Sequence, residues 1–293
     1  MARSPKPVRL AAAGIRFAPE YHRRIELLSV RLSALRAQRE GFGVSRLAGG
    51  GQEFVGYRPY RPGEDLRMLD WSLIARLDRP YVRVTRREAS ERWALVVDTS
   101  ASMGVGPPGK LQWAAEVACA VAALGLRAGV TVDVFLTSGR TLQARRQADL
   151  RGLLSFFEAE RAKGGRGLMD WIGPKRLAPD VGRVFLFGDF VDGDPEPLRS
   201  LLRRGRELAL LQVLAPLELS PPANGAVEWA DPEGASRVTL AVDGASRADY
   251  EVRLRACVEA LETFARRHGS SHRCWSSATP FEDAVRALSV TPN

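Results

Sequence analysis

Cysteine and histidine are both scarce in this chain of 293 residues, with three of each. The cysteines (Cys119, Cys257 and Cys274) are odd in number and never spaced as Cys-x-x-Cys, which excludes a disulfide framework and the usual zinc motifs. No apolar run is long enough for a membrane span or for the core of a signal peptide. These absences predict a soluble cytoplasmic protein with reduced thiols.

Acidic residues are too few in the N-terminal third to balance the basic ones. Residues 1–92 carry 19 Lys and Arg against 10 Asp and Glu, whereas residues 93–293 carry 24 of each, so the net charge of +9 lies entirely in the first segment. Two explanations are open: binding of nucleic acid or anionic lipid, or the solvated face of an amphipathic helix at residues 19–38. No nucleic-acid recognition motif accompanies the charge, which favours the helix.

One apolar run, Trp93 to Val97, ends abruptly in Asp98 and is followed by Ser100 and Ser102. A continuous apolar run of this length is typical of a strand buried on both faces in a parallel sheet. Because ligands of such sheets bind beyond the carboxyl ends of the strands, these three side chains are candidate ligand groups. Their carboxylate and hydroxyl oxygens are the type of donor that Mg²⁺ prefers.

Strand and helix patterns alternate after this point, which predicts an α/β fold with a doubly wound, mainly parallel sheet. A small N-terminal appendage with a basic helix and strands of its own is expected before it. The expected helices are residues 19–38, 110–127, 148–162, 197–206, 247–268 and 281–288. The expected strands are residues 53–60, 81–86, 93–97, 130–136, 141–145, 184–189, 208–214 and 238–242.

The loop from Gly104 to Lys110 satisfies the pattern Gly-x₄-Gly-Lys between a strand and a helix, as a nucleotide-binding P-loop does. The Ser or Thr that should follow to hold Mg²⁺ is replaced by Leu111. Pro107 and Pro108 also remove two N–H donors that a phosphate cradle needs. The residues therefore favour a metal site over a phosphate site, with nucleotide binding as the rival.

The sequence Asp98-x-Ser100-x-Ser102 resembles the opening of the metal-ion-dependent adhesion site of von Willebrand factor type A domains. A second set of residues resembles the signature of the bacterial domain-of-unknown-function-58 family. That signature comprises Gly56-Tyr57-Arg58-Pro59-Tyr60-Arg61-Pro62-Gly63-Glu64-Asp65-Leu66-Arg67, Asp70-Trp71 and Arg79-Pro80-Tyr81-Val82-Arg83. The resemblance implies a sheet of the von Willebrand factor A, Rossmann-like type. The basic residues and their helical spacing predict a basic tail and amphipathic helix at 1–40. The resemblance implies a β-containing signature subdomain at 41–90 and a von Willebrand factor A-like domain at 91–293.

The same resemblance implies a second aspartate ligand, which Asp189 matches at the end of the fourth strand, with Asp192 extending the acidic rim. The family's threonine loop, Gly-Gly-Thr followed by an apolar residue and an acid, corresponds to Gly164 to Asp170, in which Arg166 replaces the threonine. An arginine cannot ligate a cation. Two states stay open: Arg166 turns to solvent and water replaces the missing ligand of Mg²⁺, or Arg166 pairs with an aspartate and takes the place of the cation.

No activated nucleophile or acid–base pair accompanies this site, which favours a non-enzymatic protein-binding or adaptor module that engages an acidic group of a partner. The family resemblance implies a MoxR-type AAA+ ATPase as that partner, and Mg²⁺, with Mn²⁺ as a surrogate, as the ion. Two alternatives stay open. One is a metal-dependent hydrolase or nucleotide-binding enzyme that uses Asp98, Asp189 and Lys110, and the other is a nucleic-acid binder that uses the basic N-terminal region.

Overall fold

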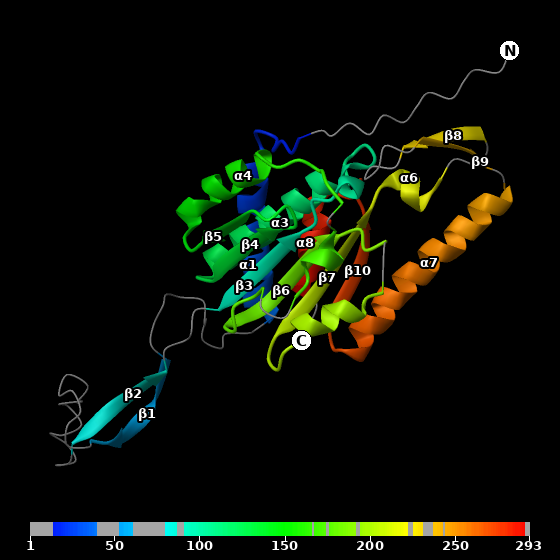
Figure 1. Cartoon of the computed structure of the whole chain (residues 1–293). Helices are drawn as coiled ribbons and strands as arrows, with labels where there is room; N and C mark the ends of the chain where they lie inside the picture. The colour runs from blue at the N-terminus through cyan, green and yellow to red at the C-terminus, as the bar shows by residue number, and fades with distance from the viewer. Residues whose placement is uncertain are drawn as a thin grey trace.

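The computed structural model describes residues 14–39, 53–60, 80–86, 91–165, 167–173, 176–191, 194–221, 225–230, 237–242 and 244–290. Its main element is a six-stranded sheet in the order β10-β7-β6-β3-β4-β5 (Figure 1). The strands are β3 Arg92–Val97, β4 Thr131–Leu136, β5 Thr141–Ala144, β6 Val181–Gly188, β7 Glu207–Leu214 and β10 Ser271–Ser276. All neighbours are parallel except β4 and β5, which confirms the α/β class and the mainly parallel sheet.

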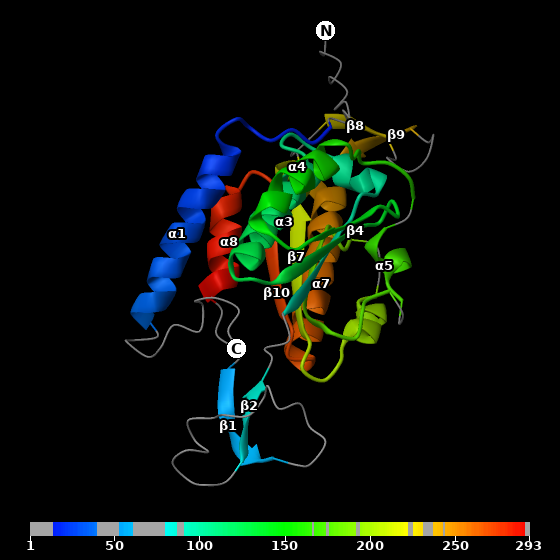
Figure 2. The same ribbon diagram turned by 90° about the vertical axis from the view of Figure 1, so that its left-hand side faces the viewer.

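Helices cover both faces of this sheet (Figures 1 and 2). One face is covered by α3 Lys110–Arg127, α4 Leu150–Glu158 and α8 Phe281–Val290, and α1 Tyr21–Arg39 packs on the outside of α3 and α8. The other packs against α5 Leu168–Trp171, the 3₁₀ helix η4 Glu196–Leu201, and α7 Gly244–Arg267. Burial on two sides explains why β3 and β7 are apolar almost throughout, since a parallel strand in such a sheet has no solvated face.

Helix α1 is part of this body although it precedes the sheet in the chain. Its apolar residues Tyr21, Ile25, Leu28 and Leu32 belong to the core around α3. The Tyr21 hydroxyl donates a hydrogen bond to the Glu116 carbonyl of α3. On α8, Glu282 accepts two hydrogen bonds from Arg24 of α1, at 2.6 and 2.8 Å. The apolar stripe expected within residues 19–38 therefore docks on the main body.

Two further pairs of strands stand apart from the main sheet. The first pairs β1 Glu53–Pro59 with β2 Tyr81–Arg86, and the second pairs β8 Gly225–Ala230 with β9 Arg237–Val242, both antiparallel. The strand expected at 238–242 therefore forms, but it belongs to the second hairpin, and β10 is the last strand of the main sheet. Most of the signature segment, residues 61–79, lies outside the described residues.

Two predicted helices are shorter than expected. The helix predicted at 148–162 begins with a 3₁₀ turn, η3 Gln147–Asp149, and its α-helical part ends at Glu158. The helix predicted at 197–206 is the 3₁₀ helix η4, which starts after Pro195 and contains Pro197. Proline supplies no N–H to a helical hydrogen bond, and 3₁₀ geometry is typical of such short segments. None of the described helices is both long and apolar enough to cross a membrane.

The connections leave the centre of the sheet in opposite directions. From β3 the chain passes through α3 to β4 on one side, whereas from β6, on the other side of β3, it passes through η4 to β7. The carboxyl ends of β3 and β6 therefore form the switch point of the sheet, which is where open α/β sheets bind their ligands.

Candidate functional site

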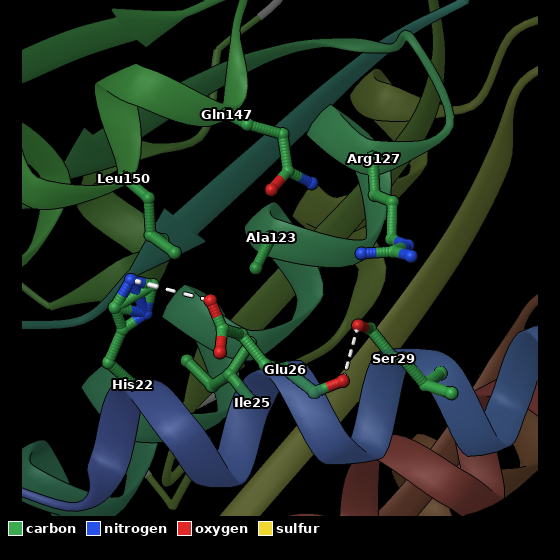
Figure 3. A pocket seen from close by; sticks show the side chains of 9 residues that line it. His22, Ile25, Glu26, Ser29, Ala123, Arg127, Gln147 and Leu150 are labelled. Carbon is green, nitrogen blue, oxygen red and sulfur yellow. Dashed lines mark hydrogen bonds and ion pairs between the residues drawn. The ribbon is translucent and has the colours of Figure 1, made fainter.

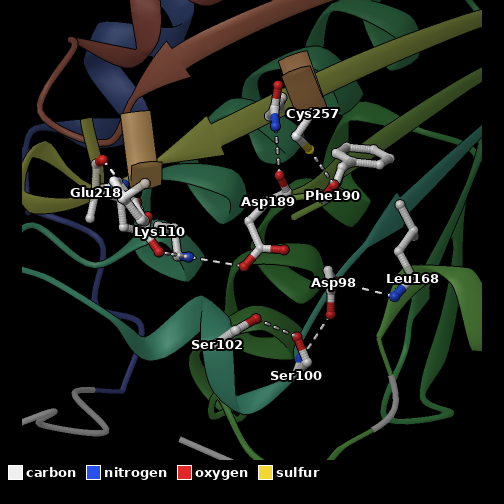
Figure 4. A network of polar contacts seen from close by, with 12 residues as sticks. Asp98, Ser100, Ser102, Lys110, Leu168, Asp189, Phe190, Glu218 and Cys257 are labelled. Carbon is white, nitrogen blue, oxygen red and sulfur yellow. Dashed lines mark hydrogen bonds and ion pairs between the residues drawn. The ribbon is translucent and has the colours of Figure 1, made fainter. Parts of the chain in front are cut away.

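Two aspartates follow the two strands that meet at the switch point. Asp98 comes directly after β3 and Asp189 directly after β6, and the last residue of β3, Val97, pairs with Phe187. The Asp98 N–H donates to the Phe187 carbonyl at 2.8 Å, which continues the ladder one residue beyond the strand. Parallel pairing thus places the two carboxylates beside each other, as the sequence predicts (Figure 4).

The Asp98 side chain is only 3% exposed and is held by hydrogen bonds from three segments. Its Oδ1 accepts from the Ser100 N–H at 2.8 Å and from the Thr137 hydroxyl at 3.3 Å, and its Oδ2 accepts from the Leu168 N–H at 3.1 Å. Burial, followed by repulsion from Asp189, raises the pKa of Asp98 to about 6 in spite of these bonds. The carboxylate is therefore oriented, but its charge is not compensated.

The serine hydroxyls lie on the same edge. Ser100 precedes, and Ser102 lies within, the 3₁₀ helix η2 Ala101–Gly104, and their two Oγ atoms are 3.1 Å apart. The lack of a side chain at Gly188 leaves space for the Asp98 side chain. A Cβ at this position would lie 3.3 Å from Asp98 Cβ and 3.5 Å from Asp98 Oδ2. Small residues and short polar side chains therefore let two carboxylates and two hydroxyls approach one another.

Asp189 has a different environment from Asp98. Its Oδ2 accepts a hydrogen bond from Lys110 Nζ at 2.9 Å, and its carbonyl accepts one from Gln212 Nε2 at 2.8 Å. The next residue, Phe190, has a positive φ of 53°, so the chain turns sharply after the aspartate. Asp189 is thus fixed through both its side chain and its backbone.

Lys110 bonds to a second carboxylate, Glu218 Oε1, at 2.7 Å. Glu218 lies on the short helix α6 Pro216–Leu219, within a stretch expected to be a simple connection. Burial would lower the pKa of Lys110, but Asp189 and Glu218 outweigh that effect and raise it. Lys110, the lysine of the Gly-x₄-Gly-Lys pattern, is therefore an ion-paired residue at the same carboxyl edge of the sheet as Asp98. In a P-loop, this lysine would bind a phosphate.

The structure thus brings four of the predicted site residues together: Asp98, Ser100, Ser102 and Asp189. Asp170 lies on α5 and is exposed. Arg166 and Asp192 lie outside the described residues, so neither state expected for Arg166 is tested.

The sequence reasoning missed Thr137, the ion-paired role of Lys110, and Glu218. A Pro-x-Glu start, with Pro216 at the first helical position and Glu218 at the third, was a signal for α6. No local signal pointed to Thr137, because it reaches Asp98 only through the pairing of β3 with β4.

These donors fit a divalent ion that keeps part of its water shell. Across the described parts of the chain, no three His, Cys, Asp or Glu side chains converge as a metal cluster. The Asp98 edge instead offers two carboxylates and two hydroxyls, all hard oxygen donors, and an uncompensated buried charge. Mg²⁺ commonly binds in this way, through one or two carboxylates while retaining several waters.

Histidine chemistry is not available at this edge. His272 of β10 reaches Asp189 only indirectly, because its Nε2 lies 3.2 Å from Gln212 Oε1 and Gln212 in turn bonds to the Asp189 carbonyl. His268 packs on the Phe264 ring, with centroids 4.6 Å apart. The described side chain that could act as a base beside Ser100 is therefore the Asp98 carboxylate and not a histidine.

A cavity of about 250 Å³ lies elsewhere, between α1, α3 and the start of α4 (Figure 3). His22, Glu26 and Ser29 of α1 face Ala123 and Arg127 of α3 across it. None of its lining residues takes part in the Asp98 network. The candidate site is thus a largely buried cluster at the carboxyl edge of the sheet and is separate from this cavity.

Comparison with known proteins gives a family and a few relatives. A family model described as "Protein of unknown function DUF58" matches residues 56–259. Uncharacterized proteins of Mycobacterium bovis and Mycobacterium tuberculosis are each 29% identical over 218 residues, which cover 70% of this chain and 68% of the relative.

Two solved structures also match, both at low identity. The conserved hypothetical protein BatB from Bacteroides thetaiotaomicron is 13% identical, with a TM-score of 0.41 over 68% of this chain and 95% of that one. An aerotolerance-related membrane protein from Bacteroides fragilis is 14% identical, with a TM-score of 0.42 over 68% and 96%. These scores are too low to assign a finer fold type. The family model, by contrast, spans most of the chain, and the protein therefore belongs to the DUF58 family of proteins of unknown function.

Proposed function

We propose that this protein is a non-enzymatic protein-binding module whose site is a degenerate metal-ion-dependent adhesion site on a von Willebrand factor A-type sheet. The observation that carries the proposal is the buried, uncompensated Asp98 carboxylate beside Asp189 at the switch point, with two serine hydroxyls alongside. A carboxylate in this condition is destabilised unless a cation or a proton neutralises it.

In this proposal Asp98 and Asp189 supply the negative charge, and Ser100 and Ser102 supply neutral oxygens. Bound Mg²⁺ would offer an open coordination position to a carboxylate of the partner. Hydrogen bonds from Ser100, Leu168 and Thr137 fix the Asp98 carboxylate in advance, which lowers the entropy lost on binding.

The partner that we propose is a MoxR-type AAA+ ATPase. This part of the proposal rests on the resemblance of the sequence to its family, since no feature of the site identifies an ATPase. The chemistry of the site restricts the contact to an exposed Asp or Glu of that protein.

The first experiment measures binding of Mg²⁺ and Mn²⁺ to the metal-stripped protein by calorimetry. Asp98→Asn keeps the size of the side chain and removes its charge, so we expect the affinity to fall by more than about tenfold. Asp180→Asn is the matched control, because Asp180 is an exposed carboxylate before β6 at the opposite edge of the sheet. Arg166→Thr restores the threonine of the adhesion-site pattern, and we expect it to strengthen binding.

Binding to a purified MoxR-type ATPase from the same organism tests the partner. Wild-type protein and Asp180→Asn should bind equally, whereas Asp98→Asn should not bind. Using a variant of this chain avoids a chelator, which would also strip Mg²⁺ from the ATPase. Equal cation binding by wild type and Asp98→Asn would refute the site, and hydrolysis of a phosphoester that depends on Asp98 would replace the proposal with an enzyme.

A further inference from the structure

Lys110 is an unusual residue for its position. It is 0% exposed, and it is the first residue of α3, where the helix dipole disfavours a positive charge. A lysine is almost never fully buried unless it is paired. The sequence gives it no partner on its own helix, since Glu116 bonds to Gln112 instead.

The partners of Lys110 come from two other parts of the chain. Asp189 follows β6 and Glu218 lies on α6, and the ammonium bridges their carboxylates at 2.9 and 2.7 Å (Figure 4). Glu218 is itself fixed: its Oε2 accepts the Ala215 N–H at 2.6 Å, and its carbonyl accepts the Tyr250 hydroxyl of α7 at 2.9 Å. The ammonium is therefore held between an anchored carboxylate and a carboxylate of the proposed site.

The charges of this network do not balance. Among the described residues of the network, Asp98, Asp189 and Glu218 contribute three carboxylates and Lys110 one ammonium, so two negative charges remain in excess. Two charges are what one divalent cation neutralises. Without Lys110 the excess would be three, and without Glu218 it would be one.

We propose that Lys110 is a resident counter-cation that competes for Asp189 and so sets how strongly the site holds a divalent ion. Only Asp189 Oδ2 bonds to Lys110, and Glu218 holds the ammonium from the other side. Asp189 can therefore give up its bond to the lysine without leaving a buried ammonium unpaired. Glu218 acts as a positioning residue, since it keeps Lys110 in place when Asp189 binds the ion. This inference rests on the proposed cation site.

The test is a set of calorimetric Mg²⁺ titrations on Lys110→Met, Glu218→Gln, the double variant and wild type. Removing a positive charge this close to Asp189 should strengthen Mg²⁺ binding by roughly tenfold or more. Glu218→Gln leaves the ammonium with Asp189 alone and should weaken binding by a similar factor. The double variant restores an excess of two negative charges, so its affinity should return to within about threefold of wild type.

Lys163→Met is the control for net charge, because Lys163 is exposed and its N–H bonds to the Thr99 carbonyl of the same edge. Its side chain should not affect Mg²⁺ affinity. The double variant removes Lys110 together with Glu218, one of its two carboxylate partners, so fewer buried carboxylates lose their cation than in Lys110→Met and folding is easier to retain. Opposite shifts in the single variants support the counter-cation.

Equal Mg²⁺ affinity in wild type, Lys110→Met and Glu218→Gln would overturn the counter-cation while leaving the proposed site intact. Binding by Lys110→Met but not by wild type would support the counter-cation and overturn the metal-dependent form of the proposed function. No binding by any variant would overturn both.

Discussion

Buried aspartates lie at both edges of the sheet, and they differ in the groups that donate hydrogen bonds to them. At the amino edge, Asp133 of β4 accepts hydrogen bonds from the Arg92 guanidinium and from Gln143 Nε2. The same Arg92 reaches the exposed Asp180 at 3.3 Å. At the carboxyl edge, the described residues that donate hydrogen bonds to Asp98 are all neutral groups, and the nearby ammonium of Lys110 bonds to Asp189 and Glu218 instead.

The two aspartates differ in whether their charge is balanced by a described residue of the chain. A buried carboxylate with an arginine partner has its charge balanced within the chain. The hydrogen bond that Arg92 donates to Asp133 also raises the pKa of Arg92. Asp98 is oriented by neutral donors, and among the described residues none supplies it with a cation. Charge that folding leaves uncompensated at a switch point is a reason to expect a ligand there.

The largest expected effect is on the pH dependence of stability. The pKa of Asp98 is raised to about 6 in the folded metal-free protein, so the folded state binds more protons than the unfolded state between about pH 4 and pH 6. Stability from this group is present at low pH and is lost as the pH rises through that window, by roughly 3 kcal/mol.

Asp98→Asn removes that titration. Guanidinium-chloride unfolding at about pH 4 and pH 7 should therefore show a larger fall in the free energy of unfolding for wild type than for the variant. The difference between the two falls should be roughly 3 kcal/mol. Equal falls for wild type and Asp98→Asn would mean that the charge of Asp98 is balanced in the folded protein, as that of Asp133 is.

The next largest effect is expected at the amino edge, where the charge of Asp133 is balanced by Arg92. Arg92→Met leaves Asp133 buried without its cation, and we expect the free energy of unfolding to fall by about 2 kcal/mol, less than for a fully buried pair because Arg92 is partly exposed. Arg199→Ala is the control, since its pair with Glu196 is exposed and should be worth less than about 0.5 kcal/mol. Cation binding should be unchanged in both variants, and a change in Arg92→Met would show that the edges are coupled.

The smallest expected effect compares two glycines of the same strand. Gly188→Ala would place a Cβ 3.3 Å from Asp98 Cβ at the carboxyl end of β6, whereas Gly182→Ala, near the amino end, has no atom closer than Glu91 Cγ at 3.9 Å. We expect Gly188→Ala to destabilise the protein by about 1 kcal/mol and to weaken Mg²⁺ binding a few-fold. Gly182→Ala should do neither, and identical results for the two would remove Gly188 from the description of the site.

Much of the framework could be predicted from the sequence because its signals are local. Helix α3 and strand β2 begin and end at the predicted residues, and the abrupt end of an apolar run marked Asp98. The shortened segments are those in which proline or a capped turn interrupts a helical pattern, as in η4 and at the start of α4. Strand β8, the partner of β9, was not predicted. The residues of this hairpin, Gly225 to Val242, show no periodic pattern that distinguishes them from a connecting segment.

By itself, the sequence determined the α/β class, the order of most elements and the four oxygen-bearing residues of the site, because hydrophobic period and strand ends are properties of contiguous residues. Only the tertiary structure decided how their charge is distributed. Lys110 is 79 residues from Asp189 and 108 from Glu218 along the chain, and their ion pairs form only when α3, β6 and α6 meet. Electrostatic compensation depends on distance in space and on burial, and neither is encoded in any local stretch of the chain.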